Sequence, residues 1–166
     1  MRSQAISALL GAAALAVGLA AGGPALAAKA EKPLKVVAPE DVKWNDDYDI
    51  RKPLLNRRGK AFRGLEVFID EKRGNCVACH HNFDVEAVGF LGNIGPDLNW
   101  VGERFTKSEL RAILVDPKRM FGDETIMPGF YVERSGARTK PELIGKTILT
   151  AQEVEDVVMY LLEMQR

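Results

Sequence analysis

The chain has 166 residues, with 23 basic and 23 acidic side chains, two cysteines and two histidines. This length suits one globular domain with or without a tail, and the balanced charge leaves no basic footprint for nucleic acid. Two cysteines are too few for a disulfide-rich scaffold, and the composition is neither collagen-like nor typical of a coiled coil.

The first segment, residues 1–27, predicts a cleaved signal peptide. Arg2 supplies a positive start, an apolar run covers residues 5–21, and Ala-Leu-Ala at 25–27 is a small-x-small cleavage signal. A membrane anchor is the alternative, but the run is rich in alanine and glycine and shorter than a span of about 20 residues. We therefore expect a periplasmic protein that has no membrane span after cleavage. Removal of Arg2 with the leader leaves one more acidic than basic side chain.

Residues 28–57 predict an extended N-terminal arm, because three prolines and many charges accompany no sustained hydrophobic period. A solvated tail is the alternative for the same composition. A packed arm would use its large apolar side chains, which are Trp44, Tyr48, Leu54 and Leu55. The functional domain is then expected to cover residues 58–166.

Hydrophobic periodicity predicts a first helix over residues 59–73. Its apolar stripe and the glycine expected to end it are Leu65, Phe68, Ile69 and Gly74. After a short cysteine-containing segment, residues 82–105 are punctuated by glycines, so we expect a loop there.

Two capping boxes mark the later helices. The box at residues 106–109 opens a helix that should end near Val115, because Asp116 precedes a proline and such residues avoid the α region. The box at 150–153 opens the last helix, and residues 117–149 between the two are expected to be mostly loop. The expected apolar faces are Leu110, Ile113 and Leu114 on the earlier helix and Val154, Val157, Val158, Leu161 and Leu162 on the later one.

The sequence shows no internal repeat and no alternation typical of strands. The expected fold is therefore all-α, with three to four short helices and long loops. Such a chain buries little apolar surface by itself, and loops of this length indicate either function or a missing constraint. A large apolar cofactor at the centre would supply that constraint.

The two cysteines lie in Cys76-Val77-Ala78-Cys79-His80, the C-x-x-C-H pattern of covalent haem attachment. Each thiol can add across one haem vinyl group, and two intervening residues place the sulfurs at the separation of those vinyls. The adjacent His80 is carried under the ring, where its imidazole can bind iron. We therefore predict one haem c per chain, with Cys76 and Cys79 as thioether residues and His80 as an axial ligand.

Other uses of these residues are weaker. A redox-active dithiol normally follows a strand in a βαβ setting, whereas a helix is expected before Cys76. A zinc site would also need His81, but adjacent histidines rarely reach one tetrahedral ion, and the second ligand pair normally comes from farther away. A disulfide between Cys76 and Cys79 would close a loop too small to stabilise much.

A second axial ligand is expected among the methionines. Met127 is favoured over Met120, because Pro128 biases Met127 toward an extended backbone and stiffens its loop. Met120 lies in a freer, more charged stretch. The remaining methionines of the mature chain are expected to pack or to lie at the surface of the last helix: Met159 and Met164.

Further contacts are expected around the haem. A metal-bound imidazole normally donates its other ring N–H to an oxygen acceptor, and the carbonyl of Pro96 is the candidate acceptor for His80. Arg104 and Arg111 are candidates for pairing with the haem propionates, with a solvated helix face as the alternative. His81 cannot cross the ring to serve as a sixth ligand, so it has no expected role.

The order helix, Cys-Val-Ala-Cys-His, Gly-Pro-Asp-Leu, helix, Met-Pro, helix resembles the class I cytochromes c. It is similar in particular to the SoxX family, the small cytochrome subunits of the SoxAX complexes of bacterial thiosulfate oxidation. The resemblance covers roughly residues 59–164. The stretches that carry it are 73–80, 92–98, Arg104 with 108–111, 125–128 and 149–156.

The resemblance implies a cytochrome c domain over residues 58–166, wrapped around one haem with His80 and Met127 as axial ligands. It also implies an electron-transfer subunit of a SoxAX-type L-cysteine S-thiosulfotransferase, which joins thiosulfate oxidatively to a cysteine of the SoxYZ carrier. Because both cysteines would be consumed as thioethers, the catalytic site is expected on the partner SoxA. A downstream cytochrome would accept the electrons. A free-standing soluble electron carrier is the alternative function.

Overall fold

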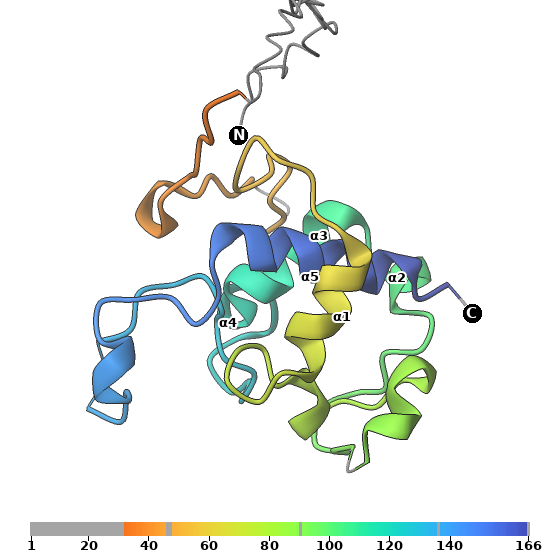
Figure 1. Cartoon of the computed structure of the whole chain (residues 1–166). Helices are drawn as coiled ribbons and strands as arrows, with labels where there is room; N and C mark the ends of the chain where they lie inside the picture. Colours follow the sequence, from red (N-terminus) through yellow and green to blue (C-terminus); the bar gives the residue numbers. More distant parts are fainter. Residues whose placement is uncertain (1–31, 46–47, 90, 136, 166) are drawn as a thin grey trace, which may run out of the picture. The chain divides into compact units, whose positions relative to one another are not determined.

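Helices are the regular elements of the described part of the chain, residues 32–45, 48–89, 91–135 and 137–165 of a computed structural model (Figure 1). Strand-like pairing within these ranges is limited to two isolated bridges, so the all-α prediction is confirmed. The helices are α1 (Ala61–Ile69), α2 (Val101–Arg104), α3 (Lys107–Val115), α4 (Pro117–Phe121) and α5 (Ala151–Glu163), with 3-10 helices η1 (Pro39–Asp41), η2 (Cys76–Ala78), η3 (Phe83–Val88) and η4 (Pro141–Leu143).

The residues from Pro33 onward form one compact unit, which contains all of these helices. The signal peptide predicted for residues 1–27 lies outside the described residues. Among the helices of the described ranges, none has the length and apolar character needed to cross a membrane.

Helix α5 is the central packing partner, since α1, α2 and α3 all pack against it. Figure 1 shows α1 crossing α5. The crossing is close because α1 carries Gly64 there: a Cβ at this position would overlap the Asp156 carbonyl group of α5. One turn farther on, Phe68 meets the Tyr160 ring edge-on, with ring centroids 5.3 Å apart. The contact buries the apolar stripes of both helices.

Both predicted capping boxes are present. The Thr106 hydroxyl accepts the Glu109 N–H, and the Glu109 carboxylate accepts the Thr106 N–H at 2.7 Å. Thr150 and Glu153 repeat this arrangement at α5, where the returning bond is 2.8 Å. Helix α3 ends at Val115, as the sequence predicts.

Helix α1 is shorter than the predicted span of 59–73. It ends at Ile69, because Asp70 takes an extended backbone. Gly74 then donates its N–H to the Val67 carbonyl at 3.2 Å, which closes a turn rather than extending the helix.

Two regions predicted to be loop contain short helices. Residues 82–105 include η3 and α2, and residues 117–149 include α4 and η4. These elements have three to six residues, too few to show a helical hydrophobic period. Helix α4 even begins at the predicted stop: the Asp116 carboxylate accepts the Lys118 N–H at 3.2 Å, and Pro117 takes the first helical position, where its missing N–H costs nothing.

The segment predicted as an extended arm contributes to the core. Trp44 is half-buried, with the Arg119 guanidinium 4.3 Å from the centre of its ring. Tyr48 is 56 % exposed, so the expectation that it packs the arm is wrong; the chain turns there with a left-handed backbone (φ 58°), and the ring stays in solvent. The buried apolar residues of this segment are Ile50, Leu54 and Leu55.

A buried ion pair joins this segment to two helices. Arg111 of α3 is 2 % exposed and Glu155 of α5 is 1 % exposed, and the guanidinium Nε and Nη2 donate to the two carboxylate oxygens at 2.6 and 2.9 Å. Arg111 Nη1 also donates to the Ile50 carbonyl at 2.6 Å, while the Leu54 N–H donates to Glu155 Oε1 at 3.0 Å. The prediction that Arg111 pairs with a haem propionate is therefore wrong, because its guanidinium is buried and hydrogen-bonded to Glu155 and Ile50.

Glu155→Gln should destabilise the protein strongly, because it leaves the Arg111 guanidinium buried without its counter-charge. Removing one partner of a buried ion pair costs about 3–5 kcal/mol, which urea unfolding followed by circular dichroism measures. The control is Arg73→Met, which removes an ion pair of 2.7 Å with Asp70 near the surface, where each side chain is about a third exposed, and should cost at most about 1 kcal/mol. Equal losses in the two variants would contradict the role given to the buried pair.

Candidate haem site

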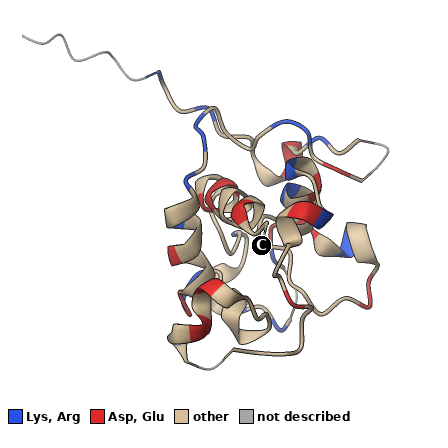
Figure 2. Ribbon diagram, turned by 90° about the vertical axis from the view of Figure 1, so that its right-hand side faces the viewer, with Lys and Arg blue, Asp and Glu red and all other residues tan. Residues whose placement is uncertain are grey.

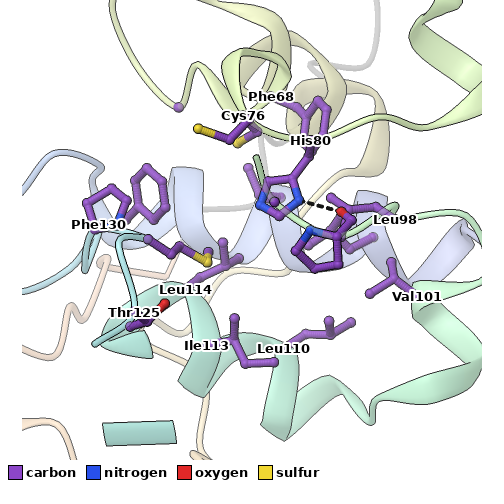
Figure 3. A pocket seen from close by; sticks show the side chains of 18 of the residues that line it. Phe68, Cys76, His80, Leu98, Val101, Leu110, Ile113, Leu114, Thr125 and Phe130 are labelled. Carbon is purple, nitrogen blue, oxygen red and sulfur yellow. Dashed lines mark hydrogen bonds between the residues drawn. The ribbon is translucent and has the colours of Figure 1, made fainter. Parts of the chain in front are cut away.

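A cavity of about 630 Å³ lies between the cysteine segment and α3. Figure 3 shows Cys76 and His80 on one side of it and side chains of α3, including Leu110, on the other. The volume is within the range of ligand pockets, roughly 300–1,000 Å³, and the walls are mainly apolar. The apolar wall residues supplied by helices α1, α2, α3 and α5 are Phe68, Val101, Leu110, Ile113, Leu114, Val157 and Leu161.

The two cysteines and His80 share one short turn. The chain enters it through Asn75, whose backbone is left-handed (φ 48°), and the N–H groups of Cys79 and His80 both donate to the Cys76 carbonyl, at 3.1 and 2.9 Å. Both thiols are free and line the cavity. Burial raises the pKa of the Cys76 thiol to about 12, so the site favours a neutral sulfur, as a thioether is. The turn therefore fits covalent attachment of a haem through both residues.

The His80 imidazole is held from two sides. Its Nδ1 donates to the Pro96 carbonyl oxygen at 2.7 Å, the contact expected from the sequence and drawn as a dashed line in Figure 3. In the neutral imidazole this bond places the proton on Nδ1 and leaves the lone pair of Nε2 available to a metal. Gly95 lies so close to the ring that a Cβ there would overlap the imidazole, and its N–H donates to the Cys79 carbonyl at 2.8 Å. The 92–98 loop thus orients the His80 imidazole.

The positions of Met127 and Met120 distinguish the two candidate iron ligands. Met127 lies in the loop after α4 and lines the cavity, whereas Met120 lies on α4 and packs against the core without lining the cavity. The chain beyond Met127 is fixed to α3, since the Phe130 N–H donates to the Leu114 carbonyl at 2.9 Å. The favoured ligand candidate therefore shares a cavity with His80.

Asp97 connects two residues near the cavity. Its backbone carbonyl accepts a hydrogen bond from Nη2 of Arg104 at 2.8 Å, and Arg104 also lines the cavity, where pairing with a propionate stays a prediction. Its carboxylate accepts a hydrogen bond from Nδ1 of His81 at 2.8 Å. The partner of His81 was not expected, although the Gly-Pro-Asp motif carried the acidic residue that provides it.

The zinc alternative has no support in this arrangement. Within the described ranges, no group of three or more His, Cys, Asp or Glu side chains is placed to hold a metal ion. His81 pairs with Asp97 rather than joining the two cysteines. A mainly apolar cavity with two thiols and one oriented imidazole fits a covalent haem.

Comparisons with known proteins agree with this geometry. A family model for cytochrome c matches residues 61–165. Among solved structures, a chain of SoxXA from P. pantotrophus matches with a TM-score of 0.72 and 32% sequence identity, covering 80% of this chain and 100% of that one. A search of curated proteins found no match.

The chain belongs to the cytochrome c family, and its fold is the all-α class I cytochrome c fold. Membership implies covalently bound haem c and a role in electron transfer. Within this family, the similarity to SoxXA supports a SoxX-type cytochrome.

Gly95→Ala should reduce the haem retained by the chain, because the added methyl group would push the His80 imidazole away from Pro96. Overpacking of this kind typically costs about 1–3 kcal/mol, so the melting temperature should fall as well. The measurement is haem absorbance per protein after coexpression with a cytochrome c maturation system. Asn93→Ala, at an exposed position of the same loop, is the control and should load haem normally. Normal loading of both variants would contradict the orienting role of Gly95.

Proposed function

We propose that this chain is the electron-transfer subunit of a periplasmic SoxAX-type L-cysteine S-thiosulfotransferase. In the proposed reaction, thiosulfate is joined to a cysteine thiol of the SoxYZ carrier. A sulfur–sulfur bond forms, the thiol proton is released and two electrons leave. This chain accepts those electrons one at a time and passes them to a downstream cytochrome.

The cysteine count carries the proposal. The full sequence contains two cysteines, and both line the cavity from the attachment turn. Once both are thioethers, no thiol remains for sulfur transfer, so the thiosulfate site and the nucleophile belong to a partner of the SoxA type. The similarity to SoxXA supports this division between two subunits.

The residues around the cavity have separate tasks in this role. Haem c, when bound, supplies a one-electron carrier. Cys76 and Cys79 would hold the ring, and His80 would present Nε2 to the iron because Pro96 occupies Nδ1. Met127, which lines the same cavity, would provide a thioether to the iron, and a methionine–histidine pair raises the reduction potential. The apolar walls keep water out, which also tunes that potential.

The rim of the cavity offers a contact surface for the partner. It consists of large apolar side chains that line the cavity and are also exposed: Ile94 (65 %), Phe121 (52 %) and Ile126 (75 %). Exposed apolar patches of this kind mark interaction sites. Figure 2 shows basic and acidic positions interspersed on the elements in view, so we expect apolar contact rather than net charge to dominate the interface.

Met127→Ala should abolish the methionine–iron charge-transfer band of the oxidised protein and lower its reduction potential, because the iron loses its thioether ligand. Met120→Ala is the matched control, since this residue does not line the cavity, and it should keep both properties. Visible spectroscopy and a redox titration provide the readouts. Loss of the band in Met120→Ala, with retention in Met127→Ala, would reverse the ligand assignment.

The partner is tested by purification from native extract. We expect the chain to copurify with a larger haem-containing subunit, to be recovered in the periplasmic fraction and to begin at Ala28 after signal cleavage. A stable haem-loaded monomer without such a subunit would instead identify a free-standing electron carrier.

A further inference from the structure

We propose that Lys118 and Arg134 are positioning residues that hold the Met127 loop closed at the haem site. This inference rests on the proposed Met127 ligand and concerns what keeps that ligand in place. Ordering a loop has an entropic cost, which contacts of the loop itself must offset. The structure provides such contacts on both sides of Met127.

Lys118 binds the segment that leads into Met127. Its Nζ donates to the carbonyl oxygens of Asp123 and Thr125, at 2.7 and 3.0 Å. Thr125 lines the cavity and lies two residues before Met127. Hydrogen bonds with a charged donor are roughly twice as strong as neutral ones, so this exposed ammonium links the loop to α4 through two carbonyl groups.

Helix α4 is in turn a fixed support for the lysine. The Asp116 carboxylate caps its first turn by accepting the Lys118 N–H at 3.2 Å. The next residue, Arg119, places its guanidinium over the Trp44 ring at 4.3 Å, a cation–π contact that connects α4 to the segment before α1. Lys118 is therefore held at its backbone while its side chain binds the loop.

Arg134 binds the segment that follows Met127. Its Nη2 donates to the carbonyl oxygen of Gly129 at 2.9 Å, two residues after Met127. Its own backbone is fixed, because the Gly145 N–H donates to the Arg134 carbonyl at 2.9 Å. The Nε of Arg134 is buried without a hydrogen-bond partner among the described residues. Burying an unpaired N–H group costs free energy. The hydrogen bond from Nη2 to Gly129 explains why the guanidinium nevertheless stays in this position.

The two cations therefore hold carbonyl groups placed symmetrically about Met127, at Thr125 and Gly129. Pro128 restricts the backbone between them. Neither contact involves His80 or the cysteines. Removal of either cation should consequently increase the fraction of molecules in which Met127 has left the iron, while haem attachment remains normal.

The test is imidazole binding to the oxidised holoprotein of Lys118→Met and Arg134→Met. Added imidazole takes the sixth position only when Met127 has left, so its apparent affinity reports the open fraction of the loop. We expect about tenfold tighter imidazole binding in each variant, from the loss of one charge-assisted contact. Hydrogen exchange of the amides at 122–129 should become faster. The conservative variants Lys118→Arg and Arg134→Lys keep a donor and should restore wild-type affinity within about threefold.

Lys146→Met is the charge-matched control. It removes an exposed cation from the segment after the loop and leaves the contacts of Lys118 and Arg134 in place. It should change imidazole affinity by less than about twofold. The proposal would be overturned if Lys118→Met and Arg134→Met bound imidazole with the same affinity as the Lys146→Met control. Normal circular dichroism and haem content show that a variant is folded, and Arg134→Gln replaces Arg134→Met if the latter does not fold.

Failure of the positioning role is distinguishable from failure of the proposed ligand. If Met127→Ala keeps the charge-transfer band, the ligand assignment itself is wrong. If Met127→Ala loses the band while Lys118→Met and Arg134→Met bind imidazole like the wild type, the ligand assignment stands and the positioning role is wrong.

Discussion

The Arg111–Glu155 ion pair fixes the helical frame that holds the wall of the haem site opposite His80. Taking two charges out of water is costly, and the pair is tolerated because its oxygens and nitrogens are hydrogen-bonded to each other and to the segment at 50–54. Leu110 and Leu114 flank Arg111 on α3 and line the cavity. Since α3 cannot turn without breaking the pair, the wall opposite His80 is held in place from outside the cavity.

The two sides of the cavity are stabilised by different means. The His80 side relies on backbone geometry: a tight turn through the cysteines, and a second loop joined to it by the bonds from Gly92 to Val77 and from Gly95 to Cys79, both 2.8 Å. The Met127 side relies on side chains that bind a loop from its two ends. A covalently attached haem requires His80 at a fixed position beside the two cysteines. In the proposed site, the strength of the bond from Met127 to the iron would depend on how firmly the Met127 loop is held.

Local patterns were predictable from the sequence, and long-range pairings were not. The attachment turn and both capping boxes follow from residues close together in the chain, and the Pro96 acceptor follows from a Gly-Pro motif 16 residues beyond His80; the structure contains each of these contacts. Arg111 was expected at a haem propionate or on a solvated helix face, because its true partner lies 44 residues away on another helix. Helix α4 was missed because one Asp-Pro pair both ends α3 and begins the next helix. In both cases the local sequence pattern was real, but the structure was decided by something that pattern does not contain: a distant partner for Arg111, and a second helix that begins at the proline for α4.

The difference between backbone constraints on one side of the cavity and side-chain constraints on the other has a consequence for electron transfer. Backbone contacts, which depend little on side-chain identity, orient the His80 imidazole, so substitutions that fill the space at Gly92 or Gly95 are the ones expected to disturb that side of the site. Met127 is different, because its loop depends on individual charged side chains that can be exchanged one at a time. In the proposed role, a change of redox partner would require a change of reduction potential. The Met127 loop is where single substitutions can adjust that potential without disturbing haem attachment or the helical frame.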